Sequence, residues 1–129
     1  MSAAQEGSIV DLTGKRVFLV EDEALVSMMF EHFLEDLGCA IVGTAARLDD
    51  ALDIGRTLAM DVAILDINLN GQLSYPVAEM LQARGIPFLF ATGYGMAGVP
   101  AELRAVPVLS KPFRQQQLAE ALIRVIGGS

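Results

Sequence analysis

Six side chains of this chain could do chemistry, and each lies at or just beyond the end of a short apolar run. They are Glu21, Asp22, Asp66, Asn68, Thr92 and Lys111. Carboxylates held close together repel one another, so one must take a proton or a cation must lie among them. A hard divalent ion such as Mg²⁺ meets that need with oxygen ligands. An aspartate beside a cation, an amine and a hydroxyl is suited to accepting a phosphoryl group, because the charge that develops on the phosphoryl oxygens is neutralised.

The apolar runs have the composition of strands that are covered on both faces of a parallel sheet. They span Arg16–Val20, Ala40–Gly43, Val62–Leu65, Pro87–Ala91 and Val106–Leu109. Helical patterns separate most of them. These cover Val26–Leu37, about Leu48–Leu58, the segment from Ser74 to Gly85, and Leu118–Ile126. This alternation predicts an α/β fold with a doubly wound five-stranded parallel sheet. The chemistry-bearing side chains should then converge at the carboxyl edge of the sheet.

Two segments of the chain show no strong pattern. Gly93–Ala105 holds three glycines and a proline, and only Ala101–Ala105 is suited to a helical turn. We therefore expect a weak or missing fourth helix there. Residues 1–13 are expected to form a flexible tail, and residues 14–129 a single domain with no chain left for an output domain.

The composition excludes several classes of protein. A hydrophobic fraction of 53% with 19% charged residues is typical of a globular chain. The net charge of −7, from 9 basic against 16 acidic residues, argues against binding to nucleic acid or to anionic membranes. No apolar run approaches the roughly 20 residues of a membrane span. With no signal peptide and Cys39 as its single cysteine, the chain is expected in the cytoplasm.

The order and strand context of these motifs resemble the receiver domains of two-component response regulators, over about residues 14–127. The matching pieces are Glu21-Asp22, Asp66, Thr92 and Lys111-Pro112-Phe113. The resemblance implies a flavodoxin-like fold with strand order 2-1-3-4-5. It also implies a phosphorylated signalling module and not a turnover enzyme.

The resemblance assigns a role to each site residue. Asp66 is the implied phosphoacceptor. Asp22, Asp66 and the Asn68 carbonyl are the implied Mg²⁺ ligands, and Glu21 binds the metal or its water shell. Thr92 and Lys111 are expected to contact the phosphoryl oxygens.

Two longer stretches resemble a narrower subgroup of receivers, named for its FATGUY motif and consisting mostly of stand-alone domains. They are Asp-Ile-Asn-Leu-Asn-Gly at 66–71 and Phe-Ala-Thr-Gly-Tyr-Gly at 90–95. The implied phosphate donor is a histidine kinase, of the HWE or a related class, or a phosphotransfer protein. The downstream partner is a protein that the sequence does not name.

The chain departs from the family at Val108, which stands where receivers usually carry a switch aromatic, and in the Asp66 loop, which lacks the usual proline. A valine has no ring to rotate. We therefore predict that the loop after Thr92 reports phosphorylation by ordering, with Gly93, Tyr94 and Gly95 as its candidate residues.

Four other interpretations compete with this one. Residues 66–71 match the start of an EF-hand loop, but its twelfth position is Val77 instead of glutamate. Gly93, Gly95 and Gly98 match a dinucleotide fingerprint, but Pro100 follows where a helix should begin. A haloacid-dehalogenase-type phosphatase would place its nucleophile after the first strand. A degenerate receiver that is never phosphorylated would not need to retain Glu21, Asp22, Asp66, Thr92 and Lys111 together. His32 is expected to be a surface residue.

Overall fold

The computed structural model describes residues 11–93 and 99–127. Its main sheet has five strands: β1 (Arg16–Val20), β2 (Ala40–Ala45), β3 (Val62–Asp66), β6 (Phe88–Thr92) and β7 (Val108–Ser110). Their order is β2-β1-β3-β6-β7, and every neighbouring pair is parallel. Counted along the chain without the short strands β4 and β5, this is the order 2-1-3-4-5. The predicted doubly wound α/β fold is confirmed.

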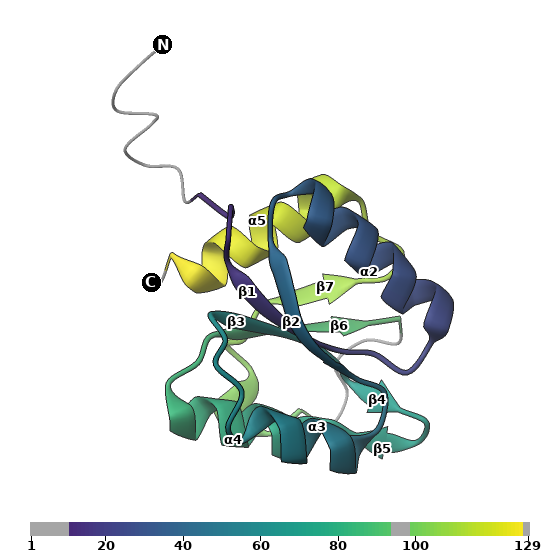
Figure 1. Ribbon diagram of the computed structural model, residues 1–129. Coiled ribbons are helices and arrows are strands. Elements are labelled where there is room, and N and C mark those ends of the chain that lie inside the picture. Colours follow the sequence, from purple (N-terminus) through teal and green to yellow (C-terminus); the bar gives the residue numbers. More distant parts are fainter. Residues whose placement is uncertain (1–10, 94–98, 128–129) are drawn as a thin grey trace.

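Helices cover both faces of the sheet (Figure 1). The helices α2 (Ala24–Asp36) and α5 (Gln115–Ile126) lie on one face, and α3 (Leu48–Gly55) and α4 (Tyr75–Arg84) lie on the other. Between β6 and β7, the described residues form only the short 3₁₀ helix η1 (Ala101–Leu103). No helix within residues 11–93 and 99–127 has the length and apolarity that crossing a bilayer requires.

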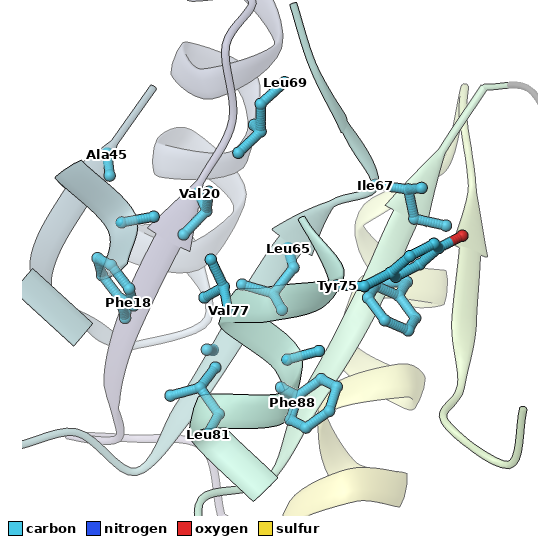
Figure 2. Packing of buried hydrophobic residues seen from close by; sticks show 14 of the residues in the cluster. Phe18, Val20, Ala45, Leu65, Ile67, Leu69, Tyr75, Val77, Leu81 and Phe88 are labelled. Carbon is cyan, nitrogen blue, oxygen red and sulfur yellow. The ribbon is translucent and has the colours of Figure 1, made fainter. Parts of the chain in front are cut away.

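The core has two parts because successive side chains of a strand point to opposite faces of the sheet. In β1, Phe18 and Val20 enter the cluster under α3 and α4, while Val17 and Leu19 enter the cluster under α2 and α5. Figure 2 shows the first cluster, where Phe18, Val20 and Leu65 of the sheet face Val77 and Leu81 of α4. This packing holds the carboxyl ends of the strands in place.

The packed part of the chain starts earlier than the boundary predicted at residue 14. Leu12 is 6% exposed and joins the cluster under α2 and α5. The Gly14 N–H donates to the Gly38 carbonyl at 2.7 Å, and the Cys39 thiol lies 3.6 Å from the Leu12 carbonyl oxygen. Residues 11–13 therefore pack with the domain, because the apolar side chain of Leu12 anchors this segment in the core. Residues 1–10 lie outside the described part.

A small hairpin after β3 was not predicted. Strands β4 (Asn68–Leu69) and β5 (Gln72–Leu73) pair antiparallel around Asn70 and Gly71. Both turn residues have positive φ, 54° and 89°, which is the requirement of a two-residue type I′ turn and the reason for the Asn-Gly sequence. The EF-hand interpretation of this segment is wrong, since it ends a strand and forms a hairpin.

We expect Asp61→Asn to lower the free energy of unfolding by about 1 kcal/mol at neutral pH. Asp61 accepts hydrogen bonds from the Arg16 main chain at 2.7 Å and from its guanidinium at 3.1 Å. These side-chain and backbone bonds lower the pKa of Asp61 to about 2. A lowered pKa stabilises the fold above the ordinary pKa of the acid, so the difference should vanish as the pH falls towards 2. Urea unfolding at several pH values measures it, with Asp53→Asn, an exposed partner of Arg56, as control.

Candidate functional site

The carboxyl edge of the sheet carries all six predicted site residues. Glu21 and Asp22 follow β1, Asp66 ends β3, Thr92 ends β6, and Lys111 follows β7. Asn68 begins β4 directly beyond Asp66. A cleft of about 590 Å³ opens here; it is lined by Asp22, Glu23, Val26, Met29, Asp66, Asn68, Asn70, Gly93, Lys111 and Pro112. The parallel sheet thus brings together residues that are up to 90 positions apart in the chain.

Three carboxylates form the centre of the site. Glu21, Asp22 and Asp66 each place an oxygen within 4.8 Å of the other two. Glu21 and Asp66 are only 4% and 6% exposed, so water screens their charges poorly. Charges this close in a buried site oppose one another strongly, and the fold holds them there because Asp66 ends β3 and Glu21 and Asp22 directly follow the neighbouring β1.

Lys111 is the cation of this cluster. Its Nζ lies 2.8 Å from Glu21 Oε1, 3.5 Å from Asp66 Oδ2 and 4.0 Å from Glu23 Oε1. Burial alone would lower the pKa of Lys111, but the Glu21 hydrogen bond and the Asp66 charge outweigh it and raise that pKa. The amine is therefore held protonated, yet one positive charge does not balance three buried or half-buried acids.

The excess of negative charge in the cluster changes the pKa of Asp66. Burial, the neighbouring Asp22 carboxyl and the charge of Glu21 raise the pKa of Asp66 to about 8, although Lys111 acts in the opposite direction. Without a further cation, Asp66 thus keeps its proton to a higher pH than an ordinary aspartate does. An oxygen-rich site whose central acid resists ionisation is suited to a divalent cation.

Main-chain groups complete the site. The Asn68 N–H donates to Asp66 Oδ1 at 3.4 Å, and the Asn70 N–H donates to Asp22 Oδ2 at 3.0 Å. Thr92 is 4% exposed, and its carbonyl accepts the Lys111 N–H at 2.8 Å. The contacts of Asn70 and of Glu23 were missed by the sequence analysis. The Asn-Gly pair at 70–71 is typical of a hairpin turn and could have indicated the hairpin. It does not reveal which carboxylate the turn contacts.

Of the three candidate residues of the loop switch, only Gly93 lies in the described part of the chain. Gly93 is exposed and lines the cleft. Tyr94 and Gly95 lie outside the described residues, so their role stays a prediction. Val108, at the start of β7, is half-buried and packs against the core cluster under α3 and α4. His32 is exposed on α2, as predicted.

Comparison with known proteins decides the family. A family model described as the response regulator receiver domain matches residues 17–123. The chain belongs to this receiver family. The five-stranded parallel sheet described above is thus the fold of a receiver.

Several relatives of this receiver are known. It is 30% identical over 119 residues to the sensory transduction protein LytR of Staphylococcus saprophyticus, in a match that covers 85% of this chain and 45% of that protein. The chain therefore spans about half the length of the curated relatives it matches. It also resembles the solution structure of SdrG from Sphingomonas melonis, with 46% identity and a TM-score of 0.75, over 88% of this chain and 96% of that one. The BeF₃-activated conformation of SdrG matches with 44% identity and a TM-score of 0.74, over 92% and 99% of the two chains.

Proposed function

We propose that this receiver accepts a phosphoryl group on Asp66 and works as a phosphorylation-driven switch, relay or phosphate sink. The observation that carries the proposal is the buried cluster at the carboxyl edge, where Glu21, Asp22 and Asp66 lie within 4.8 Å and Lys111 lies 3.5 Å from Asp66. No other group of three or more metal-ligating side chains occurs among the described residues. The domain is proposed to transmit a signal in this way and not to turn over a substrate.

The residues of the cluster fit Mg²⁺. Three carboxylate oxygens close together, one of them on an acid that resists ionisation, make a hard-oxygen site that lacks positive charge. We propose Asp22, Asp66 and the Asn68 carbonyl as ligands, with Glu21 holding the metal or its water shell. When bound, the ion supplies charge neutralisation for the incoming phosphoryl oxygens.

The side chains of the receiver then have separate roles. A carboxylate oxygen of Asp66 attacks the phosphorus of the donor phosphohistidine, the new P–O bond replaces the P–N bond, and the leaving imidazole takes a proton. Lys111 neutralises charge from 3.5 Å away, a distance that a flexible lysine can shorten. The Thr92 hydroxyl, at the end of the neighbouring strand, is proposed to donate a hydrogen bond to a phosphoryl oxygen.

The motifs of the chain indicate which protein donates the phosphoryl group and which segment passes the signal on. We infer a histidine kinase, of the HWE or a related class, or a phosphotransfer protein, acting in the cytoplasm. The FATGUY-like segment supports this donor, and the resemblance to SdrG, for which a BeF₃-activated conformation is known, supports a receiver that switches between states. Because Val108 cannot act as a switch aromatic, we propose that the segment from Gly93 reports the phosphorylated state to a downstream protein. Nucleic acid is not an expected partner at a net charge of −7.

Incubation with acetyl phosphate tests this function. We expect one acid-stable, base-labile phosphoryl adduct per chain in Mg²⁺, and almost none after the cation is chelated, because the added phosphate brings about −1.5 to −2 charge into an acidic site. Intact-mass spectrometry counts the adducts, and a peptide map locates the modified residue. Continuous release of phosphate over many turnovers would instead indicate a phosphatase. The absence of any adduct in Mg²⁺ would indicate a degenerate receiver.

A further inference from the structure

Within the hairpin β4–β5, Leu69 is the one residue whose side chain is buried. Leu69 is 1% exposed and belongs to the core cluster under α3 and α4, where Figure 2 shows it beyond Val20 at the end of β1. The hairpin residues on either side of it, Asn68 and Asn70 to Leu73, are exposed. The core therefore anchors the hairpin at the residue directly before its turn, and Asn70 of the turn lines the cleft.

The turn presents main-chain donors to two of the three clustered acids. The Asn70 N–H reaches across 48 residues of sequence to Asp22 Oδ2 at 3.0 Å. The Asn68 N–H donates to Asp66 Oδ1 at the longer distance of 3.4 Å. The turn itself is closed by a side chain, because Asn68 Oδ1 accepts the Gly71 N–H at 2.6 Å.

The direction of the Asn70 N–H depends on the left-handed backbone of the turn. Asn70 has a φ of 54° and Gly71 a φ of 89°, and only Gly, Asn and Asp adopt such angles at low cost. A turn with negative φ at these positions would rotate the peptide plane and aim this N–H away from Asp22. The Asn-Gly pair is therefore needed for the contact as well as for the hairpin.

We propose that this hairpin is a positioning element of the cation site, with the Asn70 main-chain N–H as its working group. The inference rests on the proposed Mg²⁺ site. By engaging Oδ2 of Asp22, the N–H restricts rotation of the carboxylate while Asp22 keeps an oxygen within 4.8 Å of Glu21 and Asp66. A carboxylate held in this way loses less conformational freedom when a cation binds. The side chain of Asn70 is not required for this role.

Two substitutions at one position separate the main-chain role from the side-chain role. Asn70→Pro removes the N–H and forces a negative φ, whereas Asn70→Gly keeps both the N–H and the left-handed backbone. We expect Asn70→Pro to weaken Mg²⁺ binding by about 10- to 100-fold, the usual effect of losing a group that orients a ligand, while Asn70→Gly stays within about twofold of the native chain. The dissociation constants come from Mg²⁺ titrations followed by amide chemical shifts, and circular dichroism checks the fold of each variant.

A matched pair of glycine variants covers the case in which Asn70→Pro does not fold. An added Cβ meets no atom within 4 Å at Gly71 or at Gly85, and both have positive φ, 89° and 73°. Gly71→Ala strains the hairpin turn, while Gly85→Ala places the same kind of strain at the end of α4. We expect weaker Mg²⁺ binding in the first and unchanged binding in the second.

The outcomes distinguish the inference from the function on which it rests. If the native chain binds no Mg²⁺, the proposed function fails and the inference fails with it. If the native chain binds Mg²⁺ and both Asn70→Pro and Gly71→Ala bind it equally well, only the positioning role is overturned. Equal losses in Asn70→Pro and Asn70→Gly would assign the effect to the amide side chain and would also overturn it.

Discussion

Asp66→Asn is expected to abolish phosphorylation by acetyl phosphate and, in the absence of a divalent cation, to make the domain more stable. The first effect follows because the amide of asparagine is no nucleophile for phosphorus, and the remaining acids of the cluster are expected to act on the cation instead. The second follows because the substitution removes a buried acid that its neighbours oppose. Both effects come from the same residue, so the two measurements test one description of the site.

The gain in stability should depend on pH in a definite direction. The pKa of Asp66 is raised to about 8, so between about pH 4 and pH 8 the folded chain holds a proton that the unfolded chain releases. The stability of the native protein therefore falls as the pH rises through this window, and that of Asp66→Asn does not fall for this reason. At pH 8 we expect the variant to be more stable by roughly 2–4 kcal/mol, and by much less at pH 4.

Urea unfolding in chelator across this pH range measures the difference. Adding Mg²⁺ should reduce it, because a bound cation stabilises the ionised cluster of the native chain. Asp53→Asn, which removes an exposed acid of α3, is the control and should change little. Undiminished phosphorylation of Asp66→Asn would show that another residue is the acceptor. A stability difference independent of pH would contradict the raised pKa.

Lys111→Met is expected to destabilise the domain by about 3–5 kcal/mol at neutral pH, which is the usual cost of removing one partner of a buried ion pair. The Lys111 side chain is 14% exposed, and its partner Glu21 is 1% exposed, so little water can replace the amine. Methionine keeps most of the apolar stem and removes the charge.

The matched control for this variant is Lys15→Met, since Lys15 is the only other lysine of the chain. Lys15 precedes β1 at the opposite end of the strand from the site, and we expect its substitution to change the unfolding free energy by less than about 0.5 kcal/mol. Denaturant curves of both variants at pH 7 give the comparison. Equal effects of the two substitutions would show that Lys111 is an ordinary surface lysine. Acetyl phosphate labelling should also slow markedly in Lys111→Met alone.

The central strands β3 and β6 could be predicted from the sequence because they are buried on both faces and are therefore mostly apolar. The runs around Val62–Leu65 and Pro87–Ala91 lie within one residue of the observed strands β3 and β6. The edge strand β7 instead begins at Val108, two residues after the predicted start, because the apolar run that contains it also includes Val106 and Pro107. The convergence of the site followed as well, since parallel strands end at one edge and Asp66 comes directly at such an end.

The sequence by itself thus determined the fold class and which side chains meet at the carboxyl edge. Only the tertiary structure decided how they pair. Lys111 lies closer to Glu21, at 2.8 Å, than to Asp66, at 3.5 Å, which the order of the motifs does not show. The Asn70 contact with Asp22 was equally hidden, because every residue other than proline carries the same main-chain N–H. Which N–H contacts which carboxylate depends on backbone angles and on packing between segments 48 residues apart. Neither can be predicted from residue type alone.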